Sequence, residues 1–472
     1  MKKLIYTAII LSLMNTLSAQ DRPMPQAGPA PSINIKKSKS FTLNNGLKVL
    51  VVENAKLPRV SFTLTIDNAP YTEGDKKGVD EMLSSMIGNE TEKTSKEAFN
   101  KEIDFLGADI HFSSKGASAR GLSKYKTRIL ELMAEGCLLP KFSQDDFDKE
   151  KSKLIESLKA EEKNVAANAR RVENILVFGK NHPKGEYINE ETLKNVTLAD
   201  VVSHYNTYFQ PEKAYLVVIG DVKFKDIQKQ IEDVFQIWEK GTAPQLSYSE
   251  PTDVQYTQIN FVDMPNAVQS EISVVNTSNL KMTDKEYFAA LLANQILGGG
   301  GEGRLFLNLR EKHGWTYGSY SSIGSGKYTS KFRATASVRN TVTDSAIVEI
   351  LNEIKRMRTD LVSSEDLSNA KAKYIGNFVM QIEKPETVAF YALNKETQNL
   401  PDDFYENYIK NINAVTTQDI QKAANKYFLA DNLRIVVVGK ATDVATALEK
   451  SSIPVMYFDR FGNKVEKSVI KN

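Results

Sequence analysis

Two stretches of the chain repeat each other at a constant distance, and this repeat constrains the fold more than any other feature. Residues 196–222 read VTLADVVSHYNTYFQPEKAYLVVIGDV, and residues 415–441 read VTTQDIQKAANKYFLADNLRIVVVGKA. An unbroken spacing over such a span is hard to reach by chance, so the sequence predicts two homologous halves of about 200 residues each. Identical residues recur 219 positions apart at Val196/Val415, Thr197/Thr416, Asp200/Asp419, Tyr208/Tyr427, Phe209/Phe428 and Gly220/Gly439.

Both copies predict the same local structure. Each begins with Thr-x-x-Asp, the pattern of a helix-capping box, and ends in an apolar run with strand character. We therefore expect an α+β fold in which each half is an antiparallel-rich sheet packed with helices. The predicted strands are Leu47–Val52 and Val60–Ile66, which we expect to be adjacent, and Tyr215–Ile219, Val254–Val262, Glu271–Asn276 and Leu433–Val438. Further helices are predicted at Thr94-x-x-Glu97, Ser143-x-x-Asp146, Thr283-x-x-Glu286 and Ser363-x-x-Asp366.

The start of the chain predicts export. MKKLIYTAIILSLMNTLSAQ has two lysines, an apolar run and small residues up to Ala19, which is typical of a secretory signal peptide. No later stretch of about 18 apolar residues occurs, so we expect no membrane anchor. The one cysteine, Cys137, cannot form an internal disulfide, which in an exported chain favours a bacterial periplasm. A net charge of +2 gives no reason to expect a nucleic-acid partner.

Composition also suggests how the chain is divided. The residues after the signal peptide are rich in Pro and Ala, and a second Pro- and Ser-containing stretch separates the two halves. The residues after the second half carry one apolar run, Val455–Phe458, which predicts a short hairpin or an added edge strand. The expected segments are a signal peptide (1–19), a flexible leader (20–40), an N-terminal domain (41–242), a linker (243–253), a C-terminal domain (254–450) and a tail (451–472).

The segment of residues 294–320, NQILGGGGEGRLFLNLREKHGWTYGSY, is the richest in chemical features. Four consecutive glycines and Gly303 follow the predicted helix Glu286–Leu297, so the backbone can turn sharply and approach a neighbour closely. Arg310 is expected on the helix after the turn, and Tyr317 opens an extended run. Two hydrogen-bonding side chains are thereby expected at one glycine-lined surface.

Other interpretations of these residues need weighing. Gly298, Gly300 and Gly303 satisfy the dinucleotide-binding pattern G-x-G-x-x-G, but that pattern must follow a strand and here it follows a predicted helix. Arg310 alone is also compatible with a pair to a surface acid, and Tyr317 with a buried strand position.

The segment resembles the signature of the second half of the pitrilysin/insulinase family of zinc peptidases, the group that includes the mitochondrial processing peptidase. The glycines, L-R-E-K and G-x-x-Y occur here in the family's order, and the resemblance spans nearly the whole mature chain. It implies that Arg310 and Tyr317 hold a substrate peptide against a zinc ion bound elsewhere. It also implies that Gly298, Gly299 and Gly300 let the peptide pass close to the backbone, and that the two halves form one side of a clamshell.

The same resemblance implies a zinc motif, H-x-x-E-H, early in the first half. The matching stretch, Gly78–Met86, reads GVDEMLSSM. Glu81 and Ser85 replace the two histidine ligands, and Ser84 replaces the glutamate that activates water. A neutral hydroxyl is a poor zinc ligand and a poor general base, so we expect no metal on this chain.

The remaining ligand positions are equally degenerate. Ser157 occupies the place of the family's third ligand by our placement, although Glu156 and Glu162 are close enough to leave the register open. The simplest interpretation of Asp80 and Glu81 is that they lie on a solvated helix face. The alternative is that they line what remains of the implied zinc pocket. None of the four histidines, His111, His182, His204 and His313, lies three to five residues from another, so they are expected to be ordinary core or surface residues.

Some members of this family divide the work between a zinc-bearing chain and a partner that supplies the Arg and Tyr. The sequence fits the second role, so we expect a non-catalytic, substrate-binding subunit of a secreted heterodimeric zinc metallopeptidase, with zinc on a homologous partner. The alternative is a peptide-binding or scaffolding protein of the same fold with no peptidase role. A weaker third possibility is a self-sufficient enzyme with unfamiliar ligands.

Overall fold

The computed structural model describes residues 38–242, 244 and 247–467. The predicted signal peptide over 1–19 and most of the predicted leader over 20–40 lie outside these residues. Among the helices in the described part of the chain, none combines the length and the apolarity that a transmembrane span requires.

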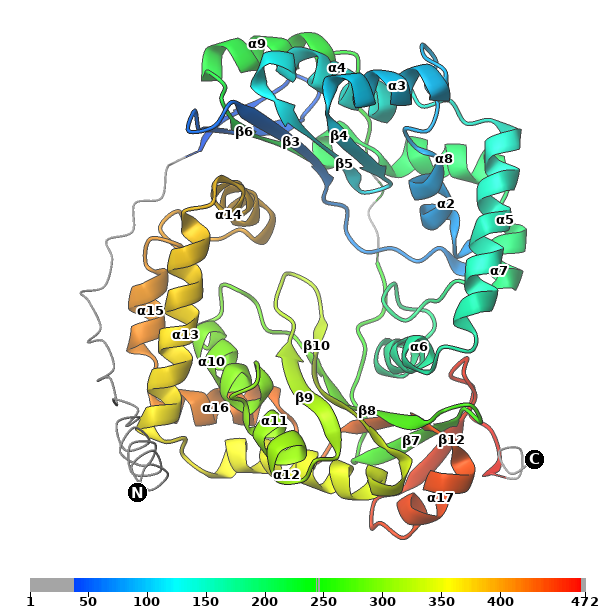
Figure 1. The fold of residues 1–472 in the computed structure, drawn as a ribbon, viewed down its shortest axis with the longest axis vertical. Coiled ribbons are helices and arrows are strands. Elements are labelled where there is room, and N and C mark those ends of the chain that lie inside the picture. Colours follow the sequence, from blue (N-terminus) through cyan, green and yellow to red (C-terminus); the bar gives the residue numbers. More distant parts are fainter. Residues whose placement is uncertain (1–37, 243, 245–246, 468–472) are drawn as a thin grey trace, which may run out of the picture. The chain divides into compact units, whose positions relative to one another are not determined.

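Two six-stranded sheets form the framework of the described chain (Figure 1). Helices cover one face of the first sheet, where Phe62, Phe99 and Phe235 are buried in a single apolar core. The first sheet contains, in spatial order, β1 (Lys39–Thr42), β2 (Lys48–Glu53), β6 (Ala214–Gly220), β3 (Arg59–Ile66), β5 (Gly116–Leu122) and β4 (Asp109–Ser113). The second contains β12 (Val455–Phe458), β7 (Gln258–Asp263), β11 (Arg434–Gly439), β8 (Gln269–Ser278), β10 (Ser330–Arg339) and β9 (Thr316–Ile323).

The two sheets repeat each other strand for strand. Strand β2 runs parallel to β6, and β7 runs parallel to β11, whereas the next three pairings in each sheet are antiparallel. One outer strand differs, because β1 is antiparallel to β2 and β12, from the predicted edge strand of the tail, is parallel to β7. The prediction of an antiparallel-rich α+β fold is confirmed.

One prediction about the first sheet is wrong. The strands expected over Leu47–Val52 and Val60–Ile66 exist as β2 and β3, but they are not adjacent, since β6 lies between them. Strand β6 carries a nearly continuous buried run, Leu216–Ile219, which requires cover on both faces and therefore a central place in the sheet.

The helices follow the predicted pattern, with shifts at two starts. The first half contains α2 (Val79–Met86), α3 (Lys96–Leu106), α4 (Lys126–Leu138), α5 (Gln144–Glu161), α6 (Val165–Phe178), α7 (Glu190–Asn195), α8 (Leu198–Tyr208) and α9 (Phe224–Phe235). The second contains α10 (Tyr287–Gly298), α11 (Arg304–Phe306), α12 (Thr343–Thr359), α13 (Ser364–Ile382), α14 (Pro385–Gln398), α15 (Tyr408–Ala414), α16 (Thr417–Tyr427) and α17 (Ala441–Glu449).

Four of the six predicted caps are confirmed. Thr197 and Thr416 form complete capping boxes, and Ser143 and Ser363 accept hydrogen bonds from the third helical N–H. The cap of α3 is Ser95 rather than the predicted Thr94.

The predicted cap at Thr283 is also wrong, because α10 begins after Glu286 with no side-chain cap. A helix as apolar as α10 is held in place by burial, so its first turn depends less on a capping residue.

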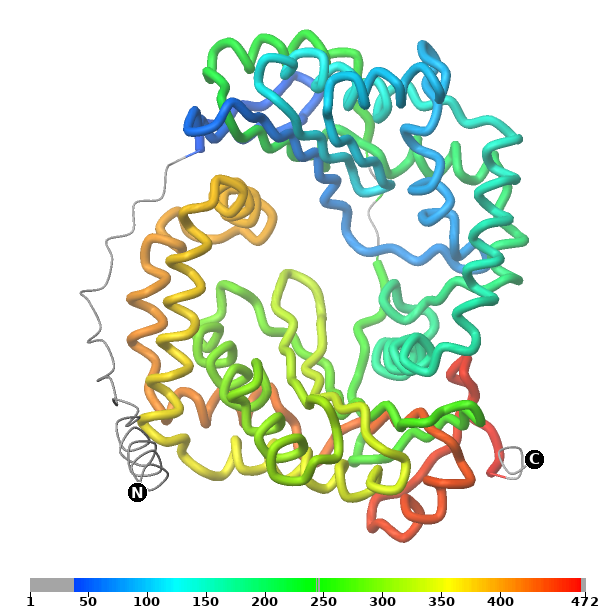
Figure 2. The backbone as a smooth tube through the Cα atoms, in the orientation of Figure 1, coloured from blue at the N-terminus to red at the C-terminus, as the bar shows by residue number. Residues whose placement is uncertain are grey.

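Helices α6 and α14 are equivalent in the repeat, and each packs on the sheet of the other half. They begin and end 220 residues apart. Helix α6 buries Val172 and Phe178 against Val275 and Val436 of the second sheet. Helix α14 buries Val388 and Ala389 against the β2 and β6 strands of the first sheet. The exchange can be followed along the backbone trace in Figure 2.

Candidate functional site

Helix α2, where the sequence predicts a degenerate zinc motif, is fixed by carboxylates and a lysine. Its N-terminal residue, Gly78, has φ of 121° and no side chain with which to cap the helix. The carboxylate of Glu73 takes that role, accepting hydrogen bonds from the N–H groups of Gly78 (3.0 Å) and Asp80 (3.1 Å). The ammonium of Lys77 pairs with Glu73 and with Glu81 (3.1 Å). Burial disfavours the charged ammonium, but both carboxylates outweigh it, so the pKa of Lys77 is raised.

The four degenerate positions do not converge on a metal. Glu81 binds Lys77, the Ser84 hydroxyl donates to the Ser114 hydroxyl (2.9 Å), and the Ser85 hydroxyl donates to the carbonyl of Met82 (2.9 Å). Ser157 is exposed on α5.

Zinc binds three or four His, Cys or carboxylate ligands arranged around one point. Across residues 38–242, 244 and 247–467, no three such side chains form a group that could hold an ion. The residues at the motif therefore do not fit zinc.

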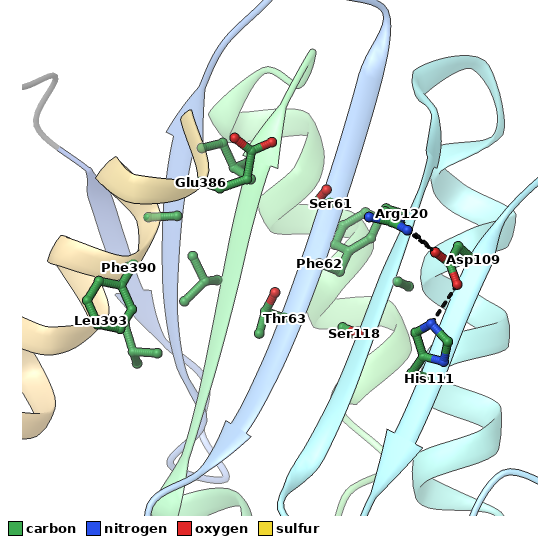
Figure 3. Close-up of a pocket in the computed structure, with 14 residues that line it drawn as sticks. Ser61, Phe62, Thr63, Asp109, His111, Ser118, Arg120, Glu386, Phe390 and Leu393 are labelled. Carbon is green, nitrogen blue, oxygen red and sulfur yellow. Dashed lines mark hydrogen bonds and ion pairs between the residues drawn. The ribbon is translucent and has the colours of Figure 1, made fainter. Parts of the chain in front are cut away.

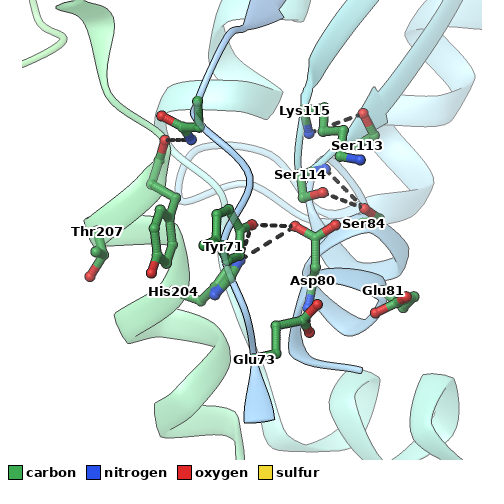
Figure 4. Close-up of polar contacts among 12 residues, drawn as sticks. Tyr71, Glu73, Asp80, Glu81, Ser84, Ser113, Ser114, Lys115, His204 and Thr207 are labelled. Atoms are coloured by element: carbon green, nitrogen blue, oxygen red, sulfur yellow. Dashed lines mark hydrogen bonds and ion pairs between the residues drawn. The ribbon is translucent and has the colours of Figure 1, made fainter. Parts of the chain in front are cut away.

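A buried cluster that the sequence did not indicate stands beside α2 (Figure 4). The Tyr71 hydroxyl lies 3.0 Å from Asp80 Oδ1 and 3.0 Å from His204 Nε2, which itself lies 3.3 Å from Asp80. The Asp80 side chain is only 18% exposed, so the expectation of a solvated helix face is wrong for this residue. The three members come from a loop, α2 and α8, and no local spacing in the sequence joins them.

Hydrogen bonding in this cluster sets the charge of Asp80. Burial alone would raise its pKa, but hydrogen bonds from His204, Ser114 and Tyr71 lower it to about 2. Burial and the neighbouring Asp80 carboxylate raise the pKa of Tyr71. Asp80 is therefore an ionised acceptor between two donors.

The cluster is not arranged as a catalytic triad. A serine nucleophile needs a histidine beside its hydroxyl, with the carboxylate behind the histidine. Here the Ser84 and Ser114 hydroxyls bond each other, and His204 meets Asp80 and Tyr71 instead. The cluster ties α2 to α8 and holds no activated nucleophile.

The Arg310 and Tyr317 side chains are both exposed on neighbouring elements of the second half. Arg310 lies on a π-helix, Leu307–Lys312, rather than on the α-helix that the spacing predicted, and single turns of π-helix occur frequently at functional sites. Its guanidinium lies 4.9 Å from the ring centroid of Phe306 and 3.5 Å from the Glu311 carboxylate. Tyr317 is 88% exposed on β9, so the alternative of a buried strand tyrosine is wrong.

Strand β9 is an outer strand of the second sheet, and the π-helix packs beside it. Among the described residues, neither the Arg310 guanidinium nor the Tyr317 hydroxyl is taken up by a buried partner. The two groups are therefore open to a ligand that lies along the β9 edge.

The glycines have an internal role that the sequence did not specify. A Cβ on Gly298 would lie 2.5 Å from the backbone nitrogen of Ser321, and a Cβ on Gly303 would lie 2.7 Å from Gly298 Cα. Helix α10 therefore ends directly against β9 because no side chain intervenes. The close passage of a substrate over Gly298, Gly299 and Gly300 stays a prediction.

Comparisons with known proteins agree with this geometry. Residues 195–374, which include Arg310 and Tyr317, match the family described as "Peptidase M16 inactive domain". The chain is similar to the probable inactive metalloprotease YmfF of Bacillus subtilis (23% identity; 80% of this chain and 87% of that protein). It is also similar to the uncharacterized zinc protease YmxG of the same organism (22% identity; 83% of this chain and 96% of that protein).

The fold has a close counterpart among solved structures. A crystal structure of a peptidase M16 inactive domain from Pseudomonas fluorescens matches 86% of this chain and 98% of its own length, with a TM-score of 0.78 and 22% identity. At that identity the likeness concerns the fold alone.

Proposed function

We propose that this chain, whose residues 195–374 match the family described as "Peptidase M16 inactive domain", is a non-catalytic member of that family that binds peptides for a homologous, zinc-bearing partner. One observation carries the proposal. The side chains at the zinc-motif positions are used in internal contacts, whereas Arg310 and Tyr317 are exposed at a sheet edge. A chain without peptide contacts would have no need of two exposed donors beside an edge strand.

In this proposal the β9 edge receives the substrate. An extended peptide adds to an outer strand through main-chain hydrogen bonds, which any sequence can make. The Arg310 guanidinium and the Tyr317 hydroxyl then donate to a carbonyl near the scissile bond, where preorganised donors stabilise developing negative charge. Zinc and the attacking water would come from the partner, since the residues around α2 do not fit a metal.

Two further observations support a divided enzyme. Bacillus subtilis has one similar protein named as inactive and another named as a zinc protease, so both kinds of relative occur in one organism. The signal peptide predicted over 1–19 would direct the chain out of the cytoplasm, and we propose a periplasmic location for the complex. The division into domains at 41–242 and 254–450 remains part of the same proposal.

The test is a cleavage assay with and without a partner. The purified mature chain should show no chelator-sensitive cleavage of unfolded peptides by itself. Addition of a homologous chain with an intact H-x-x-E-H should produce cleavage, and a chelator should abolish it. Robust zinc-dependent cleavage by the isolated chain would overturn the proposal. Peptide binding without recovery of any zinc peptidase from the native source would favour a scaffolding role instead.

A further inference from the structure

The exchange of α6 and α14 creates two equivalent junctions that differ in the side chains between helix and sheet. In the α6 junction, the carboxylate of Glu173 is 1% exposed and accepts a hydrogen bond from Ser273 (2.6 Å). It also pairs with Lys331 and with Arg333 (3.0 Å) of β10. A compact ion cluster therefore occupies the space between α6 and the second sheet.

The α14 junction has a different residue at the equivalent place. Leu393 lies 220 positions after Glu173, the same spacing that relates the two helices. The equivalent of Ser273 is Thr63, because the β3–β6 and β8–β11 pairings align Leu64 with Val274. Leu393 has no carboxylate to offer, and an ion pair across this junction joins Glu396 to Lys48 (3.6 Å). A cavity of about 430 Å³ lies between α14 and the first sheet.

The walls of this cavity differ in chemistry (Figure 3). The α14 end carries Phe390 and Leu393 together with the carboxylate of Glu386. Leu393 packs against the apolar cluster that contains Val217 and Ile219 of β6. Phe390 is 58% exposed, which is unusual for a phenylalanine and leaves its ring available to a ligand.

The floor carries hydroxyl groups from β3 and β5. Ser61, Thr63 and Ser118 line this part of the cavity and present their hydroxyls to it. At the far end, Asp109 is already paired with Arg120 and with His111 (2.7 Å). The cavity thus offers apolar surface and hydroxyls but no unpaired charge at that end.

The cavity also continues beyond α14. A second cavity of about 460 Å³ shares Ser61, Ile219 and Glu386 with the first. The two cavities therefore adjoin near the start of α14, where Lys56, Arg59 and Glu383 line the second one. An extended chain with alternating side chains matches a floor of hydroxyls and a wall of hydrocarbon.

We propose that this α14 groove, lined by Ser61, Thr63, Ser118, Val217, Phe390 and Leu393, binds an extended segment of substrate peptide through an apolar side chain. The inference rests on the proposed function, because it takes the ligand to be a peptide, and it adds a second contact on the other half of the chain. The apolar side chain packs between Phe390 and Leu393, and the hydroxyls of β3 and β5 bond the peptide backbone. The groove therefore selects for an aliphatic or aromatic residue at a distance from the scissile bond.

The test measures binding by the mature chain alone, without a partner. Fluorescent peptides carry a central Leu or Phe in a polar Ser/Gly frame, and the matched peptide carries Ser at that place. Binding of the Leu and Phe peptides should be at least about tenfold tighter than binding of the Ser peptide. Phe390→Ala should weaken it about tenfold, and Thr63→Trp, which fills the groove from an exposed position, should abolish it.

Three controls make the result specific. Phe105→Ala removes an exposed ring on α3 that lines neither cavity, and it should leave affinity unchanged. Lys312→Ala changes an exposed residue of the π-helix that lines neither cavity, and it should also leave the affinity unchanged. Circular dichroism and the unfolding midpoint must show that Thr63→Trp is folded.

The outcomes separate the groove from the proposed function. Equal affinity for the Ser peptide, wild-type affinity in both groove variants, or no peptide binding by the chain alone would each overturn the groove. If the apolar peptides bind as expected but no partner produces cleavage, the proposed function fails and the groove stands.

Discussion

The two junctions between the halves compare a filled site with an open one on the same framework. The apolar cluster at the junction of α6 with the second sheet has ten buried residues, three of them on α6, and an ion cluster lies around Glu173. The cluster at the junction of α14 with the first sheet has six buried residues, two of them on α14, and a cavity lies beside Leu393. The backbone repeat determines where a helix meets a sheet. Single side chains then determine whether that junction is packed, and so stabilises the contact, or contains a cavity that a ligand can enter.

The same contrast separates the two motif regions. Around α2, Lys77 and Asp80 are enclosed by partners, so the region where the sequence predicted a degenerate zinc motif has a structural role. Around the β9 edge, Arg310 and Tyr317 keep their polar ends in solvent. If this contrast is right, substitutions at enclosed sites should change stability, and substitutions at open sites should change binding or cleavage.

The largest effect on stability is expected at Glu173. Glu173→Leu leaves Lys331 and Arg333 in the junction without their counter-charge, at a cost of about 3–5 kcal/mol in the free energy of unfolding. The lower end applies, because the two cations are 20% and 32% exposed. Urea unfolding of the mature chain measures the change.

A rescue variant sharpens this result. Replacing Lys331 and Arg333 together with Glu173 by Met or Leu should recover most of the lost stability, since a buried ion cluster contributes little net free energy over packed hydrocarbon. If the triple variant is less stable than Glu173→Leu, the charged side chains stabilise the junction by more than neutralising one another.

The next effect concerns cleavage. Arg310→Ala should reduce kcat/KM of the reconstituted complex by about 10²–10³, the usual consequence of losing one donor to a developing oxyanion. The unfolding midpoint should move little, because the side chain is 47% exposed and makes only a surface ion pair and a contact with the Phe306 ring. Lys312→Ala, on the same π-helix and equally exposed, serves as the control and should leave the rate unchanged. An unaltered rate in Arg310→Ala would remove the β9 edge from the mechanism.

The sequence predicted local features well and long-range ones poorly. The repeat, the caps at Thr197 and Thr416, and the buried run of β6 follow from short patterns, because the interactions that define them lie within a few residues. Strand β6 follows β3 by more than a hundred residues in the sequence, yet it lies between β2 and β3 in the sheet. No local pattern in the sequence encodes this placement.

The sites divide in the same way. The Arg310 and Tyr317 positions came from a motif, and the structure adds that both are exposed. The Tyr71, Asp80 and His204 cluster joins residues up to 133 positions apart, so no spacing in the sequence could signal it. The Glu173 cluster likewise draws on both halves. Such groups become visible only when the topology brings distant elements together.

A third prediction tests whether the α2 region is structural. The pKa of Asp80 is lowered to about 2 from 3.8, so its contribution is fully present above about pH 4 and is lost as the pH falls towards 2. Asp80→Asn should therefore lower the free energy of unfolding by about 2 kcal/mol at pH 6. The difference in this free energy between the wild type and the variant should shrink as the pH falls from 4 to 2.

The comparison for Asp80 uses a carboxylate outside any such cluster. Glu156→Gln, on the exposed face of α5, should leave the unfolding curves unchanged over the same range. If Asp80→Asn is as stable as the wild type at pH 6, the cluster around Tyr71 does not stabilise α2. The claim that this region has a structural role would then be wrong.

The smallest effect is expected where the halves are most alike. Thr197 and Thr416 cap α8 and α16 through the same reciprocal hydrogen bonds, with N···O distances of 3.3 and 3.2 Å to the threonine hydroxyl and 2.9 Å in both cases to the aspartate. Thr197→Ala and Thr416→Ala should each lower the free energy of unfolding by about 1 kcal/mol. Conversion to Ser, which retains the hydroxyl, should restore most of it.

The informative comparison is whether Thr197→Ala and Thr416→Ala lower the free energy of unfolding by the same amount. Asp200 also pairs with Lys76, but this pair survives the loss of the Thr197 hydroxyl, so it does not favour one cap over the other. Urea unfolding of the four variants should give values that agree within about 0.5 kcal/mol between the halves. A larger difference would mean that the backbones of the two halves have diverged as well as their sites. The contrast between the α6 and α14 junctions would then come from a difference in backbone rather than from the exchange of Glu173 for Leu393.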